Sequence, residues 1–131
     1  AKTIAKEDYA VMCRRVIDVA GCSAGDLKVT LNGVDISASS FADYTQLYRG
    51  KNAQPVLYQS INARWTVGVG LSESGSFESV SFVNGMSTHR GGTHINALVQ
   101  QLSKRIQERV EKLDPELSVV VSQGMIKRHL F

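Results

Sequence analysis

The stretch Ser81 to Asn96, SFVNGMSTHRGGTHIN, is the only candidate for anion binding in this chain. Gly91, Gly92 and Thr93 precede a long amphipathic segment, and the first N–H groups of a helix have no partner within that helix. Such a helix start can bind phosphate. The same residues could equally form a tight strand-to-helix corner, in which the glycines adopt positive φ and Thr93 caps the helix. Local physics favours the corner.

Other familiar sites are not indicated. Neither GxxxxGK[ST] nor GxGxxG is present, which excludes two common phosphate-binding loops, and no GxSxG context selects a serine nucleophile. Cys13 and Cys22 match neither a redox CxxC motif nor a zinc-ligand pair, so a reducing compartment fits best. His89, His94 and His129 never approach a ligand spacing with these cysteines. We therefore expect neither a metal nor a cofactor bound by this chain.

The composition is that of one soluble domain spanning residues 1–131. Hydrophobic residues make up 43% and charged residues 21% of the chain, and the formal net charge is +3. The positive excess lies entirely in residues 84–131, which hold seven Lys or Arg and four Asp or Glu. A solvated helix face is favoured over a nucleic-acid groove as its explanation. No segment is apolar over the roughly 18 residues that a bilayer span requires, so we expect no membrane partner.

The spacing of apolar residues predicts an α+β fold. The helical segments are 9–20, which Asp8 can cap and Gly21 ends, then 41–48, capped by Ser39 or Ser40, and a long helix of about 20 residues from Thr93 that Asp114-Pro115 stops. The predicted strands are a hairpin over 27–36 around Asn32-Gly33, an edge strand at 56–61, an antiparallel pair formed by 64–72 and 77–84, and a short strand at 118–122. Gly68 and Gly70 share one face, which another element can approach closely.

Each predicted helix has an apolar stripe expected to face the core. In the first helix, Arg14, Arg15 and Asp18 lie on another face, and the stripe consists of Tyr9, Met12, Val16, Val19 and Ala20. In the short helix it consists of Phe41, Tyr44, Leu47 and Tyr48. In the long helix it consists of Ile95, Leu98, Val99, Leu102, Ile106, Val110 and Leu113.

The sequence SFVNGMSTHRGGTHINAL resembles the strand, loop and helix of the transducer domain in type IIA DNA topoisomerases, where Phe-x-Asn is followed by Thr-x-x-Gly-Gly-Thr-His at this spacing. Further segments agree in the same order: RRVIDVAG, LNGVDI, FADYTQLY, ARWTVGVGLSES and MIKRHLF. Arg90 and Val83 look more like eukaryotic topoisomerase II than bacterial gyrase. The resemblance spans residues 9–131.

This resemblance implies the transducer (ribosomal-protein-like) fold of GHKL-linked ATPases, in which a mixed or antiparallel sheet has helices packed on one face. Residues 1–21 would be the N-terminal helix that leads in from a GHKL ATPase domain before Ala1. The domain would be truncated at its C-terminus, because MIKRHLF should lead into a further strand. An open sheet edge of that kind would make the fragment self-associate or leave it only marginally stable.

The resemblance also implies a function in a larger enzyme. The domain would relay ATP binding and hydrolysis in the GHKL domain to DNA strand passage, in a homodimer that also contains a DNA-cleavage core. ATP and Mg²⁺ belong to that full-length enzyme, and the Gln-Thr-Lys loop that contributes a lysine to the γ-phosphate should fall after Phe131. We therefore expect no catalysis by this chain alone. The implied location is the nucleus, with an organellar pool left open.

The family contacts DNA through a lysine cluster near the end of the long helix. Alignment on His94 places that cluster near residues 111–113, where Lys112 alone keeps the charge. Lys104, Arg105 and Arg109 lie on the preceding turns and can supply positive potential. Two rivals remain: a free-standing α+β nucleic-acid-binding module that uses this helix, and a small enzyme with a site around His89 and His94.

Overall fold

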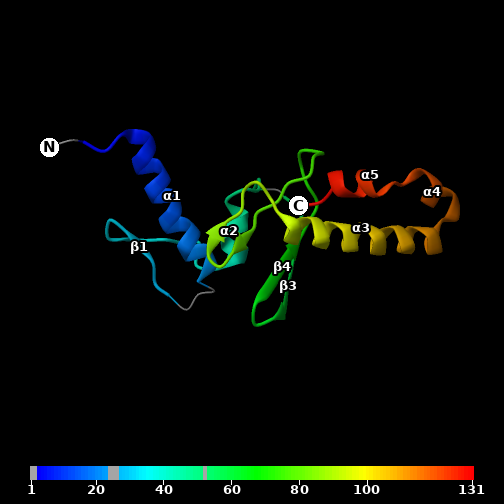
Figure 1. Cartoon of the computed structure of the whole chain (residues 1–131), viewed down its shortest axis with the longest axis horizontal. Coiled ribbons are helices and arrows are strands. Elements are labelled where there is room, and N and C mark those ends of the chain that lie inside the picture. The colour runs from blue at the N-terminus through cyan, green and yellow to red at the C-terminus, as the bar shows by residue number, and fades with distance from the viewer. Residues whose placement is uncertain (1–2, 24–26, 52) are drawn as a thin grey trace. The chain divides into compact units, whose positions relative to one another are not determined.

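The structure, a computed structural model, describes residues 3–23, 27–51 and 53–131. The chain forms two compact units: unit 1 comprises Ala1–Lys51 and Phe82–Ser87, and unit 2 comprises Asn52–Ser81 and Thr88–Phe131. Helices and small antiparallel sheets occur in this chain (Figure 1), which confirms the predicted α+β class. The expectation of a single transducer domain over residues 1–131 stays a prediction.

The described residues of unit 1 form two helices and two short hairpins. Its elements are α1 (Lys6–Cys22), β1 (Thr30–Leu31), β2 (Val34–Asp35), α2 (Phe41–Gln46), β5 (Phe82–Val83) and β6 (Met86–Ser87). The hairpin predicted around Asn32-Gly33 is confirmed, and both turn residues have positive φ, 51° and 82°. Ser40 is confirmed as the cap of α2, because its Oγ accepts a hydrogen bond from the Asp43 N–H at 3.1 Å.

The first helix buries only part of its predicted apolar stripe. It begins at Lys6, so Asp8 lies in the first turn and is not the cap. Ala20 of the stripe is buried as predicted, but Tyr9, Met12 and Val19 are exposed, and Asp18, predicted on another face, is buried. The prediction was wrong for these residues because the burial comes from Tyr44 of α2 packing against the last turn of α1, where Gly21 leaves room for its ring.

Tyr44 is the most buried large side chain among the described residues, and polar groups surround its hydroxyl. The Tyr44 hydroxyl donates to Asp18 Oδ1 at 2.5 Å and lies 2.9 Å from the Tyr48 hydroxyl, which accepts from Arg14 Nη2 at 2.8 Å. Burial, and next the hydrogen bond to Asp18, raises the pKa of Tyr44. The phenol therefore stays protonated near neutral pH and supplies the donor that a buried carboxylate requires.

The predicted antiparallel pair of 64–72 with 77–84 is not formed. Instead β4 (Trp65–Val69) pairs with β3 (Leu57–Asn62), and Phe82–Val83 pairs with Met86–Ser87. The chain reverses at Asn84 and Gly85, which have φ of 50° and 74°. This Asn-Gly turn is of the same kind as the turn at Asn32-Gly33. Because of it, Phe82–Val83 pairs with Met86–Ser87 and not with residues 64–72.

Unit 2 places one long helix beside two short ones. These are α3 (Thr93–Leu113), α4 (Pro115–Val120) and α5 (Gln123–Arg128), and α5 runs back along α3 (Figure 1). Val99, Ile126 and Leu130 form the buried cluster, and the partly buried apolar residues around it are Val69, Phe77, Ile95 and Val121. The length of the long helix and its end at Asp114 are confirmed, although Leu113 at the end of its predicted stripe is exposed.

The strand predicted at 118–122 is wrong, since this segment belongs largely to α4. Asp114 caps that helix by accepting from the Leu117 N–H at 3.0 Å, and Pro115 occupies the first helical position, which its fixed φ favours. A strong helix start therefore overrides the β preference of three successive valines. Val119 and Val120 are exposed on the resulting helix.

The close approach predicted for the face of the strand glycines is confirmed at Gly68, whereas Gly70 is paired at the edge of its strand. A Cβ on Gly68 would lie 2.7 Å from the Tyr58 ring, and Gly70 exchanges two backbone hydrogen bonds of 2.9 Å with Phe131. The end of the chain thus lies antiparallel to residues 70 and 71. Self-association through an open sheet edge stays a prediction.

Two kinds of feature were not found in the described part of the chain. In residues 3–23, 27–51 and 53–131, no helix combines the length and the apolar character needed to cross a bilayer. Within the same ranges, no cluster of three or more His, Cys, Asp or Glu side chains is placed to hold a metal ion. Cys13 and Cys22 are free and half-buried.

We predict that Gly21→Ala lowers the free energy of unfolding by about 1 to 3 kcal/mol, because its Cβ would lie 2.5 to 2.7 Å from Tyr44 atoms. Urea denaturation followed by circular dichroism measures this change. The control is Gly124→Ala in α5, where the new Cβ would meet the Ser122 Oγ at 3.8 Å. The control should be neutral or stabilising, since alanine favours helix over glycine. Equal destabilisation by both changes would contradict the packing argument.

Candidate functional site

The motif from Ser81 to Asn96 forms the place where the chain leaves unit 2 and returns to it. Ser81 and Thr88 belong to unit 2, and the hairpin Phe82–Ser87 between them belongs to unit 1. The Thr88 N–H donates to the Ser81 carbonyl at 2.8 Å, the two hydroxyls share a hydrogen bond of 2.5 Å, and the Thr88 hydroxyl donates to the Ser81 carbonyl at 3.1 Å. These bonds continue the β5–β6 ladder by one pair. We call Ser81, Thr88 and His94 the junction.

His94 joins the junction to the start of α3. Its Nε2 lies 3.3 Å from the Thr88 Oγ1, and its ring fills the space beside Gly92, where a Cβ would lie 2.9 Å from two ring atoms. Gly91 has a φ of 73°, the conformation in which glycine costs least, whereas Gly92 is extended. The two glycines therefore have different roles: Gly91 lets the chain reverse direction, and Gly92 leaves room for the His94 ring. Both roles suit the corner interpretation of this motif.

Thr93 does not cap the long helix. Gly92 occupies the N-cap position, Thr93 is the first helical residue, and no side chain of the described residues accepts a hydrogen bond at this cap. The prediction failed because the glycine adopts the extended cap conformation, so the helix begins one residue earlier than a Thr93 cap would require. His89 and Arg90 in the preceding turn are exposed.

The hairpin between Ser81 and Thr88 is anchored within unit 1. The Phe82 ring packs edge-on against Tyr44, with centroids 5.1 Å apart, and against Phe41 at 6.3 Å. The Arg15 guanidinium donates to the Gly85 carbonyl at 2.8 Å. Aromatic pairs of this geometry add to the stabilisation from area burial. The Phe of the motif thus belongs to the core of unit 1.

Serine, threonine and histidine at the junction are the groups of a nucleophilic site, but their geometry serves another purpose. Ser81 is 8% exposed, and its hydroxyl faces both the hydroxyl and the carbonyl of Thr88. His94 reaches Thr88 and not Ser81 in the hydrogen bonds of this group. A nucleophile must present its oxygen to a substrate with a base beside it. This arrangement instead fastens two chain segments to a helix.

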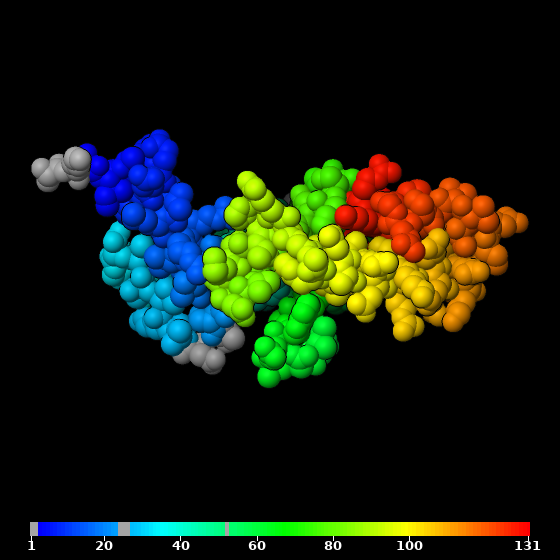
Figure 2. Space-filling view, in the orientation of Figure 1, coloured from blue at the N-terminus to red at the C-terminus, as the bar shows by residue number. Residues whose placement is uncertain are grey.

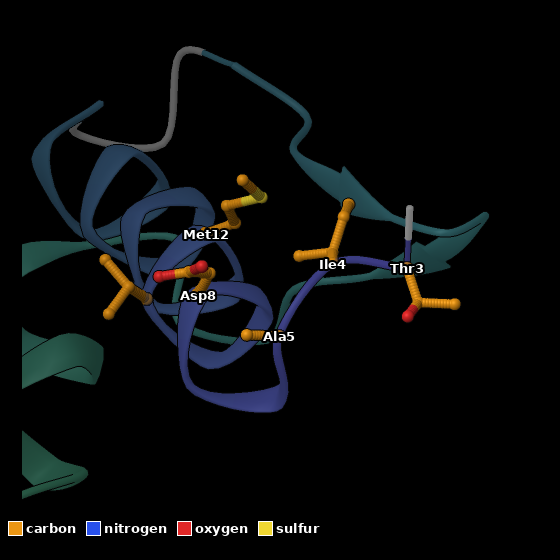
Figure 3. A pocket seen from close by; sticks show the side chains of 6 residues that line it. Thr3, Ile4, Ala5, Asp8 and Met12 are labelled. Atoms are coloured by element: carbon orange, nitrogen blue, oxygen red, sulfur yellow. The ribbon is translucent and has the colours of Figure 1, made fainter. Parts of the chain in front are cut away.

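A shallow groove lies at the start of α1, and its lining is mostly apolar. The residues that line it are Thr3, Ile4, Ala5, Asp8, Val11 and Met12. Figure 3 shows Ile4 on the segment before the helix and Met12 on the helix itself, with the carboxylate of Asp8 close to Met12. One carboxylate among apolar side chains does not make a pair of acid and base. The groove is a surface for packing rather than for chemistry.

The four predicted DNA-contacting residues all lie exposed on α3. Arg105, Arg109 and Lys112 follow the spacing i, i+4 and i+7 and share one face, with Lys104 about 100° around the helix from Arg105. Figure 2 shows part of the surface of α3, in yellow, uncovered beside α4 and α5. The Arg105 guanidinium lies 3.7 Å from the Glu108 carboxylate, a pair of exposed groups that contributes little. We call these four residues the basic face.

Three features of the site were not found from the sequence. The turn at Asn84-Gly85 carries the same signal as Asn32-Gly33, so the pattern could have been recognised. Arg15 and Asp18 were predicted only to lie on another face of the first helix than its apolar stripe. No local pattern points to their partners Gly85 and Tyr44, which lie 70 and 26 residues away.

Comparison with known proteins shows which family the chain belongs to. The family described as DNA gyrase B matches residues 33–128, most of the chain, and the chain belongs to this family. DNA topoisomerase 2 of Arabidopsis thaliana is 40% identical over 129 residues, which cover 93% of this chain and 9% of that protein. The mitochondrial DNA topoisomerase 2 of Dictyostelium discoideum is 37% identical, with coverage of 92% and 10%. The chain thus spans about a tenth of the length of these relatives.

Solved structures give the same answer. The ATPase and transducer domains of DNA topoisomerase II from Balamuthia mandrillaris match with a TM-score of 0.82 and 39% identity, over 93% of this chain and 30% of that one. The ATPase region of Saccharomyces cerevisiae topoisomerase II matches with a TM-score of 0.79 and 37% identity, over 100% and 32%. The resemblance inferred from the sequence is confirmed, and the chain corresponds to part of a topoisomerase II ATPase region.

We predict that Gly92→Ala destabilises the chain by about 1 to 3 kcal/mol because the new Cβ collides with the His94 ring. In a His94→Ala background the ring is absent, so the same glycine change should cost much less. Thermal unfolding of the four proteins of this double-mutant cycle measures the coupling. A full cost of Gly92→Ala in both backgrounds would show that the backbone and not the ring requires glycine.

Proposed function

We propose that this chain relays ATP-driven domain closure to DNA strand passage within a topoisomerase II. The observation that carries the proposal is the likeness to the ATPase and transducer domains of the Balamuthia mandrillaris enzyme over 93% of the chain. The partners of such a relay are a GHKL ATPase domain, a DNA-cleavage core and a second subunit. ATP and Mg²⁺ would act in the GHKL domain, and the substrate would be nuclear DNA. The mitochondrial relative supports an organellar alternative.

A relay needs stiff bodies with more than one arrangement, and it needs no catalytic group. The chain offers stiff bodies of this kind. Within unit 1, α1 makes hydrogen bonds to the β1–β2 turn, to α2 and the residues just after it, and to the β5–β6 turn. Arg14 and Arg15 donate in these bonds, and Tyr9 and Asp18 accept. Within unit 2, α3 is a helix of 21 residues packed against α5. Movement of a neighbouring domain would act on such elements as wholes.

The basic face of α3 is the proposed DNA contact. Its side chains are exposed, and three of them point to the same side, so they can follow a phosphate backbone together. Glu108 and Glu111 on the same helix limit the positive potential. We therefore propose a weak, sequence-independent contact that gains strength in the dimeric enzyme, where two such faces would line one DNA cavity.

The isolated chain should bind duplex DNA with a Kd weaker than about 1 μM at physiological salt. Replacing all four residues of the basic face by Gln should weaken binding further and lower the salt slope by about one for each phosphate that the protein no longer neutralises. Filter binding over a range of salt measures both quantities. The control variant replaces four basic residues outside α3 by Gln, Lys6, Lys28, Lys51 and Arg64, and so removes the same number of positive charges.

Two results would count against this assignment. If the control reduces the salt slope as much as the change in the basic face, net charge alone explains the binding. If the unaltered chain binds tightly, with nanomolar affinity at physiological salt, the free-standing nucleic-acid-binding module becomes the better function.

The chain alone should show no ATP turnover, because a relay has no nucleotide site of its own. A coupled assay with Mg²⁺ and ATP should give a rate equal to that of the His89→Ala, His94→Ala double variant and of buffer. A rate that the unaltered chain shows and the double variant lacks would favour the small-enzyme alternative around these two histidines.

A further inference from the structure

Helix α1 holds the hairpin Phe82–Ser87 at its turn. Arg15 Nη1 donates to the Gly85 carbonyl at 2.8 Å across 70 residues of sequence, and Gly85 has a φ of 74° within that turn. At the other end of the hairpin, the Phe82 ring packs against Tyr44 at 5.1 Å. The hairpin is therefore fixed to unit 1 at its turn and at its base.

The same hairpin is continuous with the junction at both of its ends. Ser81 precedes it and Thr88 follows it, and the backbone bond between them extends the ladder Val83↔Met86 and Phe82↔Ser87 by one pair. Thr88 in turn contacts His94 in the first turn of α3. A ladder closed by a tight turn deforms less than an irregular loop, because moving one strand breaks bonds to the other.

We propose that the hairpin Phe82–Ser87 is a coupling element through which Arg15 of α1 controls how firmly the first turn of α3 is held. The proposal rests on the relay function above. The Arg15 guanidinium holds the Gly85 carbonyl, the β5–β6 ladder connects that turn to Thr88, and Thr88 contacts His94. Each step is a covalent bond or a hydrogen bond of the structure. Arg15 is a positioning residue in this scheme, since it acts through the hairpin and touches no substrate.

Arg14 provides a matched control for Arg15. Both are exposed arginines on α1, and each donates one side-chain hydrogen bond of 2.8 Å. The acceptor of Arg14 is the Tyr48 hydroxyl, which lies just after α2 in unit 1. It reaches the hairpin through Tyr44 and the Phe82 ring and makes no bond to the turn at Gly85. A general effect of reduced charge or reduced helix stability should therefore appear in both variants.

Amide hydrogen exchange of the whole 131-residue chain, measured by NMR or mass spectrometry, tests the proposal. Arg15→Ala should speed exchange at Thr88 and at Asn96 by about two- to tenfold, the effect expected from removing one solvent-exposed hydrogen bond. The Asn96 N–H bonds the Gly92 carbonyl in the first turn of α3. Arg14→Ala should leave these amides unchanged, and Arg15→Lys should restore part of the protection because a donor remains.

The proposal is overturned if Arg14→Ala speeds exchange at Thr88 and Asn96 as much as Arg15→Ala does. It is also overturned if Arg15→Ala alters only amides of residues 3–51. Should Arg15→Ala unfold the chain, the comparison of Arg15→Lys with Arg14→Lys decides by the same criterion. The readout involves neither DNA nor ATP, so failure of this coupling and failure of the basic face to bind DNA are seen in separate experiments.

Discussion

The hydrogen bonds between Ser81 and Thr88 are the constraint on which the rest of this structure depends. They close the hairpin Phe82–Ser87 at its base, so a segment that is central in sequence leaves unit 2, packs in unit 1 and returns six residues later. Both residues make these bonds with backbone and hydroxyl groups, which satisfies polar atoms that would otherwise be costly at a half-buried site. The glycines after Thr88 then turn the chain into α3.

Unit 1 shows how a small core can be specified by polar pairs. Its buried apolar residues among those described are Ala20, Ala38 and Tyr44, which remove little apolar area from water. Asp18 is 5% exposed and is satisfied by the Tyr44 hydroxyl. Removing either partner would leave a buried polar group unpaired, so this contact selects one packing of α2 on α1 more sharply than apolar burial could.

The arrangement of functional groups fits a mechanical part better than a catalyst. Serine, threonine and histidine are brought together, but they bond one another and hold the start of a helix. Charged side chains that could meet a phosphate backbone remain outside, on the exposed side of α3. Stiff helices and exposed positive charge on α3 are what the proposed relay and its proposed DNA contact would require.

Local signals in the sequence determined the elements that short-range physics controls: the Asn32-Gly33 turn, the Ser40 cap, the long helix and its end at Asp114, and the family through its motif. Tertiary structure decided the rest. It buried Asp18 and left Tyr9 exposed, paired β4 with β3, and placed Val119 and Val120 in a helix. It also gave Gly92 its purpose beside the His94 ring. The burial of Asp18 depends on Tyr44, 26 residues away, and a periodic pattern records which side chains are apolar but not which surface arrives to cover them. The β3–β4 pair, the helix at Val119 and the place of Gly92 depend on nearby residues, whose effect a periodic pattern does not record either.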